Sequence, residues 1–600
     1  MTRWLASPLL FAAAGLGWLA SPVHALPAHH HGSTNSPPVV KVKNGTYAGI
    51  HSAEYNQDFF LGMPYAQKAP RFTVSQHLNS SWEGIRNATA YPPHCVGYGS
   101  DNVGYPMSED CLYLNVIRPA GIDETAKLPV VVWIHGGGLF MGGSADRRYN
   151  LSFIVQNSVA QGTPLIGVSL NYRLSAFGFP MGQLALDAGI TNLGFKDQRL
   201  ALRWVHENIG AFGGSPNKVT LWGESSGAES VSAQTLAYGG RDNGGLFRAV
   251  IAQSGYGGFI GGRFPGGLNA TDRMQHVYDT LVRNTTTCRN TVGTRESLDC
   301  LRALPLEDLH RALNGTAANP WGPVLDGDFV ADYPSRQLRE GRFPPVAVLI
   351  GCNSDEGSSF GTGYGPGGRG VDTDEEMRRG IVDAIVGLDV VHGKSSSSSR
   401  EEQVADELMY LYPDIQAVGV PGLDKWPVIQ AGDAVAEAMG LQYRRTAALF
   451  GDFKMQHARR RANLAFAAQG LPSWSYRFDV VLPGLPGFIG ATHFQEVAFV
   501  FDNVRGDGYE ENPFANNTEA LTALAKTMST AWVNFVTGLD PNGPNGLRGV
   551  DAWPVYNTSA GGGVGQNMVW SDKGSYVEMD SWRAEGINYF IENSLAVFGL

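Results

Sequence analysis

One short stretch near the middle of the chain restricts its possible folds more than any other: Gly-Glu-Ser-Ser-Gly at residues 223–227. It follows the apolar run Val219–Trp222 and precedes a segment expected to be helical. Between a strand and a helix, this glycine-x-serine-x-glycine pattern is typical of a sharp turn that presents the serine hydroxyl above the end of a sheet. Side chains at either glycine would collide with the strand or the helix. The pattern therefore predicts Ser225 as a nucleophile, and we interpret Glu224 as a structural partner of a nearby polar group.

Short apolar runs alternate with longer helical stretches beyond residue 125. The expected strands are Pro129–Ile134, Leu165–Leu170, Val219–Trp222, Ala249–Ala252, Val346–Ile350 and Trp474–Phe478. Helices such as Gly194–Ile209 lie between them. This alternation predicts a mostly parallel sheet that is covered by helices on both faces. Closer to the N-terminus, the alternating residues 39–43 lead into Asn44-Gly45, which predicts a hairpin.

Composition and charge exclude several classes of protein. With 600 residues, of which 43% are apolar and 17% charged, the chain can bury a large core. Its formal net charge is −11 and it has no long basic run, which excludes nucleic acid as the default partner. The glycine-rich residues 361–370 and the serine-rich residues 394–400 are expected to be surface loops. We therefore expect residues 39–600 to form a single catalytic domain.

The N-terminus predicts export. Arg3 precedes an apolar stretch over residues 4–20, and Val23-His24-Ala25 ends it with small residues at both outer positions. This pattern is typical of a cleaved signal peptide over residues 1–25. A retained membrane anchor is the alternative, but Pro8 interrupts the stretch, which is short for a span of about 20 residues. Residues 26–38, with three consecutive histidines, are expected to form a flexible mature N-terminus rather than a metal site. We expect a secreted protein without an integral membrane segment.

Sequons and cysteines agree with export. Nine Asn-x-Ser/Thr triplets predict N-glycans, at Asn44, Asn79, Asn87, Asn150, Asn269, Asn284, Asn314, Asn516 and Asn557. Pairing between near neighbours would join Cys95 to Cys111 and Cys288 to Cys300, although four bridged cysteines allow three connectivities. The remaining Cys352 follows an apolar run and is interpreted as a buried, inert thiol.

A second glycine-rich motif lies upstream of Ser225. His135-Gly136-Gly137-Gly138 follows the apolar residues 130–134 directly. A flexible turn is the plain structural interpretation. After a buried strand and ahead of a serine nucleophile, however, such a run is typical of a loop whose N–H groups bind the oxyanion of an acyl-transfer intermediate. A serine nucleophile also needs a base and a third group that orients the base.

The chain resembles the type-B carboxylesterase/lipase family of α/β-hydrolases, which includes fungal lipases and cholinesterases. The resemblance runs from about Val39 to the C-terminus. It rests on separate motifs, FLGMPYA at 60–66, SEDCLYLNV at 108–116, NYR at 171–173, NLGFKDQ at 192–198, PVLDG at 323–327 and WPVY at 553–556. It implies an α/β-hydrolase fold, with a large, mostly parallel central sheet, helices on both faces and a small N-terminal antiparallel sheet.

The resemblance also implies the two partners of the serine. The family's acid corresponds to Glu356, within residues 351–357, and its base to His493, within residues 490–496. Asp355 is the neighbour to be excluded. Independently, the order of serine, then acid, then histidine is the one that this fold requires.

Other positions follow the family or depart from it. The resemblance implies the backbone N–H groups of Gly137, Gly138 and Ser226 as oxyanion donors, and the cysteine pairs fit two small disulfide loops of the family. Ser226 replaces a usual alanine, which is expected to have no effect because only its N–H is used. Leu139 stands where an aromatic residue is frequent, and Glu229 stands where small residues are common.

The residues between Cys95 and Cys111 distinguish the subclasses of the family. Lipases of the family carry a long amphipathic flap there, whereas residues 96–110 are few, polar and rich in glycine, so interfacial activation is not expected. They also contain no tryptophan of the kind that cholinesterases use to bind a quaternary ammonium. We therefore expect a serine carboxylesterase that forms an acyl-enzyme with short- to medium-chain or soluble esters, without a metal or organic cofactor. A lipase or sterol esterase is the alternative, and a non-catalytic binding or adhesion protein is the remote one.

Overall fold

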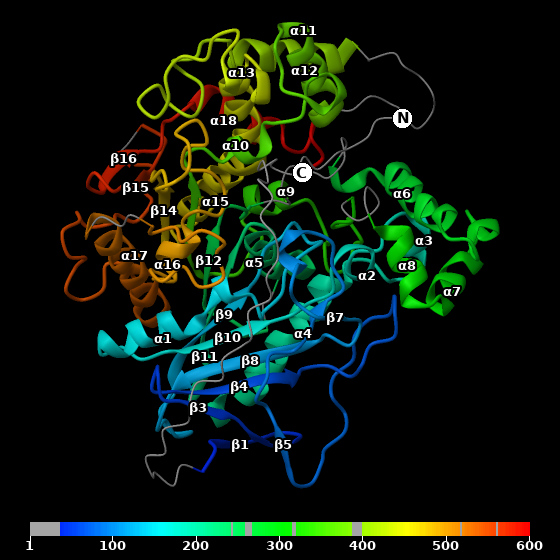
Figure 1. Ribbon diagram of the computed structural model, residues 1–600, viewed down its shortest axis with the longest axis vertical. Helices are drawn as coiled ribbons and strands as arrows, with labels where there is room; N and C mark the ends of the chain where they lie inside the picture. The colour runs from blue at the N-terminus through cyan, green and yellow to red at the C-terminus, as the bar shows by residue number, and fades with distance from the viewer. Residues whose placement is uncertain are drawn as a thin grey trace, which may run out of the picture.

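The structure is a computed structural model of the chain (Figure 1). It describes residues 36–600 except 242–243, 258–266, 315–319, 387–398, 516–518 and 560–561. The predicted signal peptide, the three histidines, the sequon at Asn516 and most of the serine run lie outside the described residues.

An 11-stranded sheet forms the centre of the molecule, in the order β16-β15-β14-β13-β12-β11-β9-β10-β8-β4-β3. The strands are β3 (Ile50–Ser52), β4 (Gln57–Pro64), β8 (Tyr113–Pro119), β9 (Leu128–Ile134), β10 (Ile166–Leu170), β11 (Gly214–Glu224), β12 (Ala249–Gln253), β13 (Ala347–Asn353), β14 (Ser473–Phe478), β15 (Gln566–Trp570) and β16 (Tyr576–Met579). All neighbours from β10 to β15 pair in parallel, and the strands at both edges pair antiparallel. The mostly parallel sheet of an α/β-hydrolase fold is therefore confirmed.

Successive residues of the inner strands enter different cores. In β9, Val130, Val132 and Ile134 belong to one apolar cluster, and Val131 and Trp133 belong to a second. Side chains alternate across a strand, so a continuous apolar run fits a strand that is covered on both faces. This explains why the inner strands could be predicted from their apolar runs.

Helices cover each face of the sheet (Figure 1). On one face lie α4 (Leu193–Asn208), α5 (Ser226–Leu236) and α15 (His457–Ala468), and on the other lie α1 (Leu151–Ala160) and α17 (Glu519–Gly538). A third apolar cluster at the top of Figure 1 is built by α11 (Asp374–Ile381), α12 (Ser399–Leu411), α13 (Ala434–Met439), α14 (Tyr443–Gly451) and α18 (Ala584–Asn593).

The small N-terminal sheet differs from the expectation. β1 (Val39–Val42) and β2 (Gly45–Ala48) form the expected antiparallel hairpin, with Val42 opposite Gly45. However, β5 (Ile85–Asn87) pairs with β2 in parallel, so the sheet is mixed rather than antiparallel. All three residues of β5 are exposed, and an exposed strand carries no apolar pattern from which it could be predicted.

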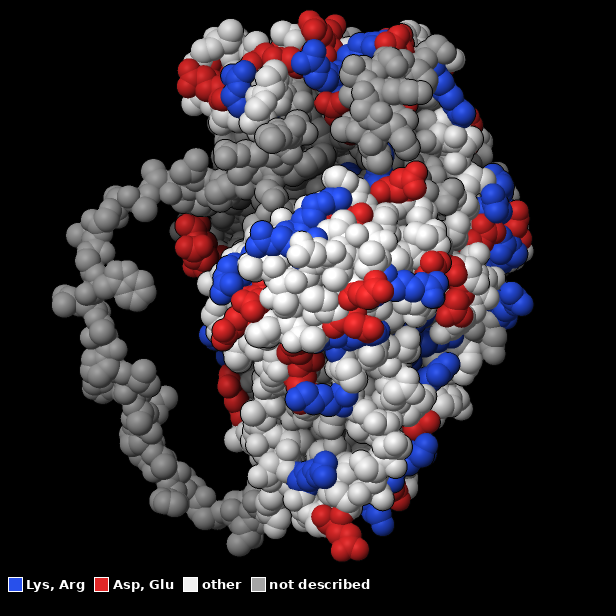
Figure 2. Space-filling view, turned by 90° about the vertical axis from the view of Figure 1, so that its right-hand side faces the viewer, with Lys and Arg blue, Asp and Glu red and all other residues white. Residues whose placement is uncertain are grey.

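Both near-neighbour disulfides are present, Cys95–Cys111 and Cys288–Cys300. Cys352 is a free, buried thiol in β13, and burial raises its pKa well above the ordinary value, which keeps the thiol protonated and unreactive. Within the described ranges, no helix combines the length and apolar character needed to cross a membrane. On the face seen in Figure 2, Lys and Arg side chains are interspersed with Asp and Glu side chains.

Candidate active site

Ser225 occupies a strained turn between β11 and α5. Its backbone has φ 57° and ψ −127°, a conformation that non-glycine residues rarely adopt. The turn is tight because a Cβ on Gly227 would lie 2.1 Å from the carbonyl oxygen of Ile134. A Cβ on Gly223 would lie 2.4 Å from the Gly227 backbone. Strand and helix thus approach each other through two glycines, as the sequence predicted.

Glu356 and His493 are in direct contact at the same edge of the sheet. Glu356 follows β13 and His493 lies beyond the end of β14, and His493 Nδ1 is 2.7 Å from Glu356 Oε2. The other carboxylate oxygen accepts hydrogen bonds from Asn353 N at 2.8 Å and from Ser254 Oγ at 2.5 Å. Because the carboxyl ends of parallel strands meet at one edge, β11, β13 and β14 bring all three predicted residues to this edge.

The second ring nitrogen of His493 faces another carboxyl group. His493 Nε2 lies 3.2 Å from Oε1 of Glu224, which is 1% exposed. Burial alone would lower the pKa of His493, but the negative charges of Glu224 and Glu356 outweigh it and raise this pKa to about 9. Burial raises the pKa of Glu224 well above the usual range of a carboxyl. The nearby polar group expected for Glu224 is thus the imidazole of His493.

A third buried carboxyl group, Glu496, completes the surroundings of His493. Its oxygens accept hydrogen bonds from Gln253 Nε2 at 2.9 Å and Asn353 Nδ2 at 2.7 Å. Burial, followed by the charge of Glu356, raises the pKa of Glu496. The sequence motifs do not indicate the roles of Glu496, Gln253, Asn353 or Ser254. The available signal was a polar residue at the end of an apolar strand, which applies to Gln253 and Asn353 only.

The glycine-rich loop, residues 135–143, lies directly against the Ser225 turn. A Cβ on Gly136 would be 3.1 Å from Cβ of Ser225. Gly137 has φ 97° and Gly138 has φ 62°, values that favour glycine. The next residue, Leu139, also has a positive φ, and its N–H donates a 3.0 Å hydrogen bond to Ser226 Oγ. The expectation that only the N–H of Ser226 is used is therefore wrong, since its hydroxyl connects α5 to this loop.

The disulfide loop, residues 95–111, packs on the glycine-rich loop. Tyr98 N donates to Phe140 O at 2.7 Å, and Gly142 N donates to Asn102 Oδ1 at 3.1 Å. Asn102 is 6% exposed, so this second hydrogen bond is shielded from water. Both loops therefore depend on each other for their conformation.

The remaining site residues are buried. Leu139 is fully buried, and Glu229, in the first turn of α5, is 2% exposed. Asp355, the neighbour of Glu356, forms an ion pair with Lys425. In the described part of the chain, no group of three His, Cys, Asp or Glu side chains is arranged to hold a metal ion.

Comparisons with known proteins agree with this architecture. Residues 36–566 match the model of the carboxylesterase family. Lipase 1 of Geotrichum candidum is 30% identical, over 94% of this chain and 96% of the relative. Secreted lipase 1 of Botryotinia fuckeliana is 32% identical over 93% of each chain. The crystal structure of EstA from Aspergillus niger has the same fold, with a TM-score of 0.75 and 24% identity over 95% of this chain and 100% of that one. The chain therefore belongs to the carboxylesterase family of carboxylic ester hydrolases.

Proposed function

We propose that the protein is a secreted serine esterase that uses Ser225, Glu356 and His493 as its catalytic triad. The observation that carries this proposal is the 2.7 Å contact between His493 Nδ1 and Glu356 Oε2, at the sheet edge that also holds the Ser225 turn. A base held by a buried acid beside a strained serine is the arrangement that nucleophilic catalysis needs.

The reaction proceeds in two halves. His493 takes the proton of Ser225 as Oγ attacks the ester carbonyl, and Glu356 stabilises the imidazolium that forms. The N–H groups of Gly137, Gly138 and Ser226 stabilise the oxyanion. The alcohol leaves with the proton from His493, and water then hydrolyses the acyl-enzyme by the same route. The chain's own residues supply every group that these steps require.

We propose short- to medium-chain or soluble esters as substrates. The disulfide loop is short and is hydrogen-bonded to the glycine-rich loop. A flap that opens on oil droplets would have to be longer and free to move away from the site. Activity on long-chain esters is the second candidate, favoured by the names of the relatives from Geotrichum candidum and Botryotinia fuckeliana, which are lipases.

The first test is hydrolysis of p-nitrophenyl esters from acetate to palmitate by the wild type, Ser225→Ala and Ser232→Ala. Ser232 is a matched control, because it lies on the same helix, α5, and its hydroxyl accepts a hydrogen bond from Gly257 N. We expect a maximum at short acyl chains, loss of activity in Ser225→Ala and retention in Ser232→Ala. A maximum at long chains would establish the lipase alternative. Inactivity of the wild type on all esters would favour a binding protein.

Secretion, N-glycans and a single domain over residues 39–600 belong to the same proposal. The relative from Botryotinia fuckeliana is named a secreted lipase, which supports export. Expression of the full chain in a eukaryotic secretion host should give a mature protein that begins at Leu26 and loses mass on enzymatic deglycosylation. An unprocessed, cell-associated product that begins at Met1 would contradict export.

A further inference from the structure

Two catalytic loops are joined by a network that the proposed mechanism does not use. The acid loop, residues 353–359, carries Glu356, and the base loop, residues 490–496, carries His493. Asp355 N donates to Ala491 O at 2.9 Å, and Ala491 N donates back to Asp355 Oδ2 at 2.7 Å. These two hydrogen bonds lie one residue from Glu356 and two residues from His493. Asp355 therefore connects the acid loop to the base loop close to both Glu356 and His493.

The approach between the two loops at this point is very close. Gly490 has φ 67°, and a Cβ there would lie 2.3 Å from Asp355 Oδ2. The base loop thus wraps around the Asp355 carboxylate, which is almost completely buried. A buried carboxylate in such a place requires a compensating positive charge.

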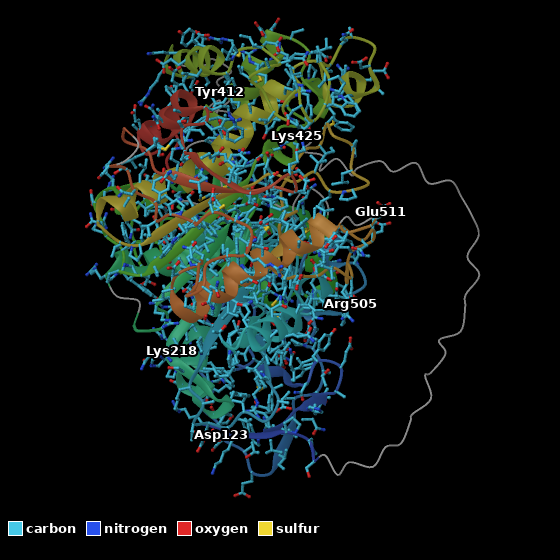
Figure 3. The ribbon with its side chains drawn as sticks, turned by 90° about the vertical axis from the view of Figure 1, so that its left-hand side faces the viewer. Asp123, Lys218, Tyr412, Lys425, Arg505 and Glu511 are labelled. Atoms are coloured by element: carbon cyan, nitrogen blue, oxygen red, sulfur yellow. A yellow bond between two sulfur atoms is a disulfide. The ribbon has the colours of Figure 1, made fainter. Side chains whose placement is uncertain are left out.

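Lys425 supplies that charge from a distant part of the chain. It lies in the segment between α12 and α13, in the upper half of Figure 3. Its Nζ is 2.6 Å from Asp355 Oδ2 and 2.5 Å from Asp479 Oδ1, and its side chain is only 12% exposed. Asp479 directly follows β14, so the ammonium also binds the strand end from which the base loop departs.

The charges explain why this cation matters. Burial raises the pKa of Asp355, and Lys425 opposes that rise. Burial alone would lower the pKa of Lys425, but Asp355 and Asp479 outweigh it and raise this pKa. Without the ammonium, Asp355 would be protonated or would turn toward water, and in both cases it would hold Ala491 N less strongly.

We propose that Lys425 is a positioning residue for the triad: through Asp355 and Asp479 it holds the acid loop and the base loop at the separation that the contact between His493 and Glu356 needs. This inference rests on the proposed function, because it assigns a role within the same triad.

The experiment compares the wild type with Lys425→Met, Lys425→Arg, the double variant Lys425→Met/Asp355→Asn and the control Lys43→Met. Lys43 lies in the turn between β1 and β2 and forms an exposed ion pair with Glu207. The readouts are kcat and KM on a short p-nitrophenyl ester, the unfolding temperature, and the far-downfield proton NMR signal of His493 Nδ1–H. That signal is assigned by its loss in His493→Gln.

We expect Lys425→Met to lower kcat by about 10- to 100-fold with KM within about twofold of the wild type, because a small displacement of a catalytic group acts on the chemical step. The downfield signal should weaken or move upfield. Lys425→Arg retains the positive charge and should recover part of kcat. The double variant should lie between Lys425→Met and the wild type, because the Asp355 charge is removed with its cation and Asp479 keeps Arg477 as a partner. Lys43→Met should behave as the wild type.

An unchanged kcat and an unchanged downfield signal in Lys425→Met would overturn the proposal. An equal loss in Lys425→Met and the double variant would also contradict it, because the proposal assigns part of the loss in Lys425→Met to the unpaired charge of Asp355. If Lys425→Met does not fold, Lys425→Arg and the double variant test the proposal by the same readouts. Inactivity of the wild type would contradict the proposed function instead. The downfield NMR signal would then still show whether Lys425 affects the contact between His493 and Glu356.

Discussion

At the scale of single residues, the most informative contact is the one between Glu224 and His493. The imidazole lies between two carboxyl groups, Glu356 at Nδ1 and Glu224 at Nε2. A base must accept a proton, yet two adjacent negative charges hold the proton that it already carries. Burial opposes this effect, because it raises the pKa of Glu224 and the two groups then compete for one proton. The pH dependence of the reaction therefore belongs to the pair rather than to His493 alone.

Replacement of Glu224 by Gln should move the acidic limb of the pH profile of kcat/KM. In the proposed mechanism activity requires neutral His493, so it rises as the pH increases through the pKa of this residue, which the charges of Glu224 and Glu356 raise to about 9. Glutamine carries no charge, and the limb should therefore shift to lower pH by about one unit or more. Measurements of kcat/KM from about pH 5 to about pH 10 cover both the ordinary and the raised pKa of a histidine and therefore measure this shift. A limb at the same pH in both proteins would show that Glu224 does not act on the base.

Sequence reasoning reached only part of this site, for a physical reason. Ser225, Glu356 and His493 lie in local motifs, and their order along the chain is characteristic of the fold. The contacts of Glu224 with His493 and of Lys425 with Asp355 join residues that are far apart in the sequence. Such contacts depend on how the loops pack, and no spacing of residue types indicates them.

At the scale of elements, the disulfide loop acts as a support for the glycine-rich loop. Residues 137–139 all have positive φ, and backbone in that conformation persists only where its surroundings hold it. In the disulfide loop, Tyr98 N donates a hydrogen bond to Phe140 O and Asn102 Oδ1 accepts one from Gly142 N. The disulfide between Cys95 and Cys111 closes this loop at its base.

Asn102→Leu should therefore lower kcat by about 10-fold with little change in KM, because the buried Gly142 N–H loses its acceptor and the proposed oxyanion donors move out of position. Val103→Ala is the matched control, since Val103 is the next residue and is 77% exposed. Steady-state kinetics on p-nitrophenyl acetate measure both variants. An unchanged kcat in Asn102→Leu, or an equal fall in both variants, would show that the disulfide loop does not support the glycine-rich loop.

The elements also differ in how well the sequence predicts them. All six predicted inner strands are present, because burial on both faces leaves a continuous apolar run. The predicted end of β11 at Trp222 was two residues short, since Gly223 and Glu224 still pair with β12. The strand therefore continues to the residue before Ser225. A glycine followed by a charged residue does not predict a strand, so this extension could not be expected from the sequence.

At the scale of the whole molecule, one continuous helical run connects two of the apolar clusters. α14 leads through residues 452–456 into α15 without a break. Phe450 and Phe453 belong to the cluster at the top of Figure 1, whereas Ala462 and Phe466 belong to one of the two clusters that flank the central sheet. Asp452, within this run, forms an ion pair with Arg583, the residue that precedes α18, and this contact anchors α18 to the run. Neither cluster can lose its packing without disturbing the same helix.

We therefore expect residues 39–600 to unfold as one cooperative unit. A chain of this length could in principle hold several domains, each with its own transition. Here the helical run from Tyr443 to Ala468 and the shared central sheet couple the clusters, so the loss of one exposes apolar surface of the others. Calorimetry, far-ultraviolet circular dichroism and tryptophan fluorescence should give one coincident transition under conditions in which unfolding is reversible. Two separated transitions, with the first confined to the helices at the top of Figure 1, would mean that those helices form a second folding unit.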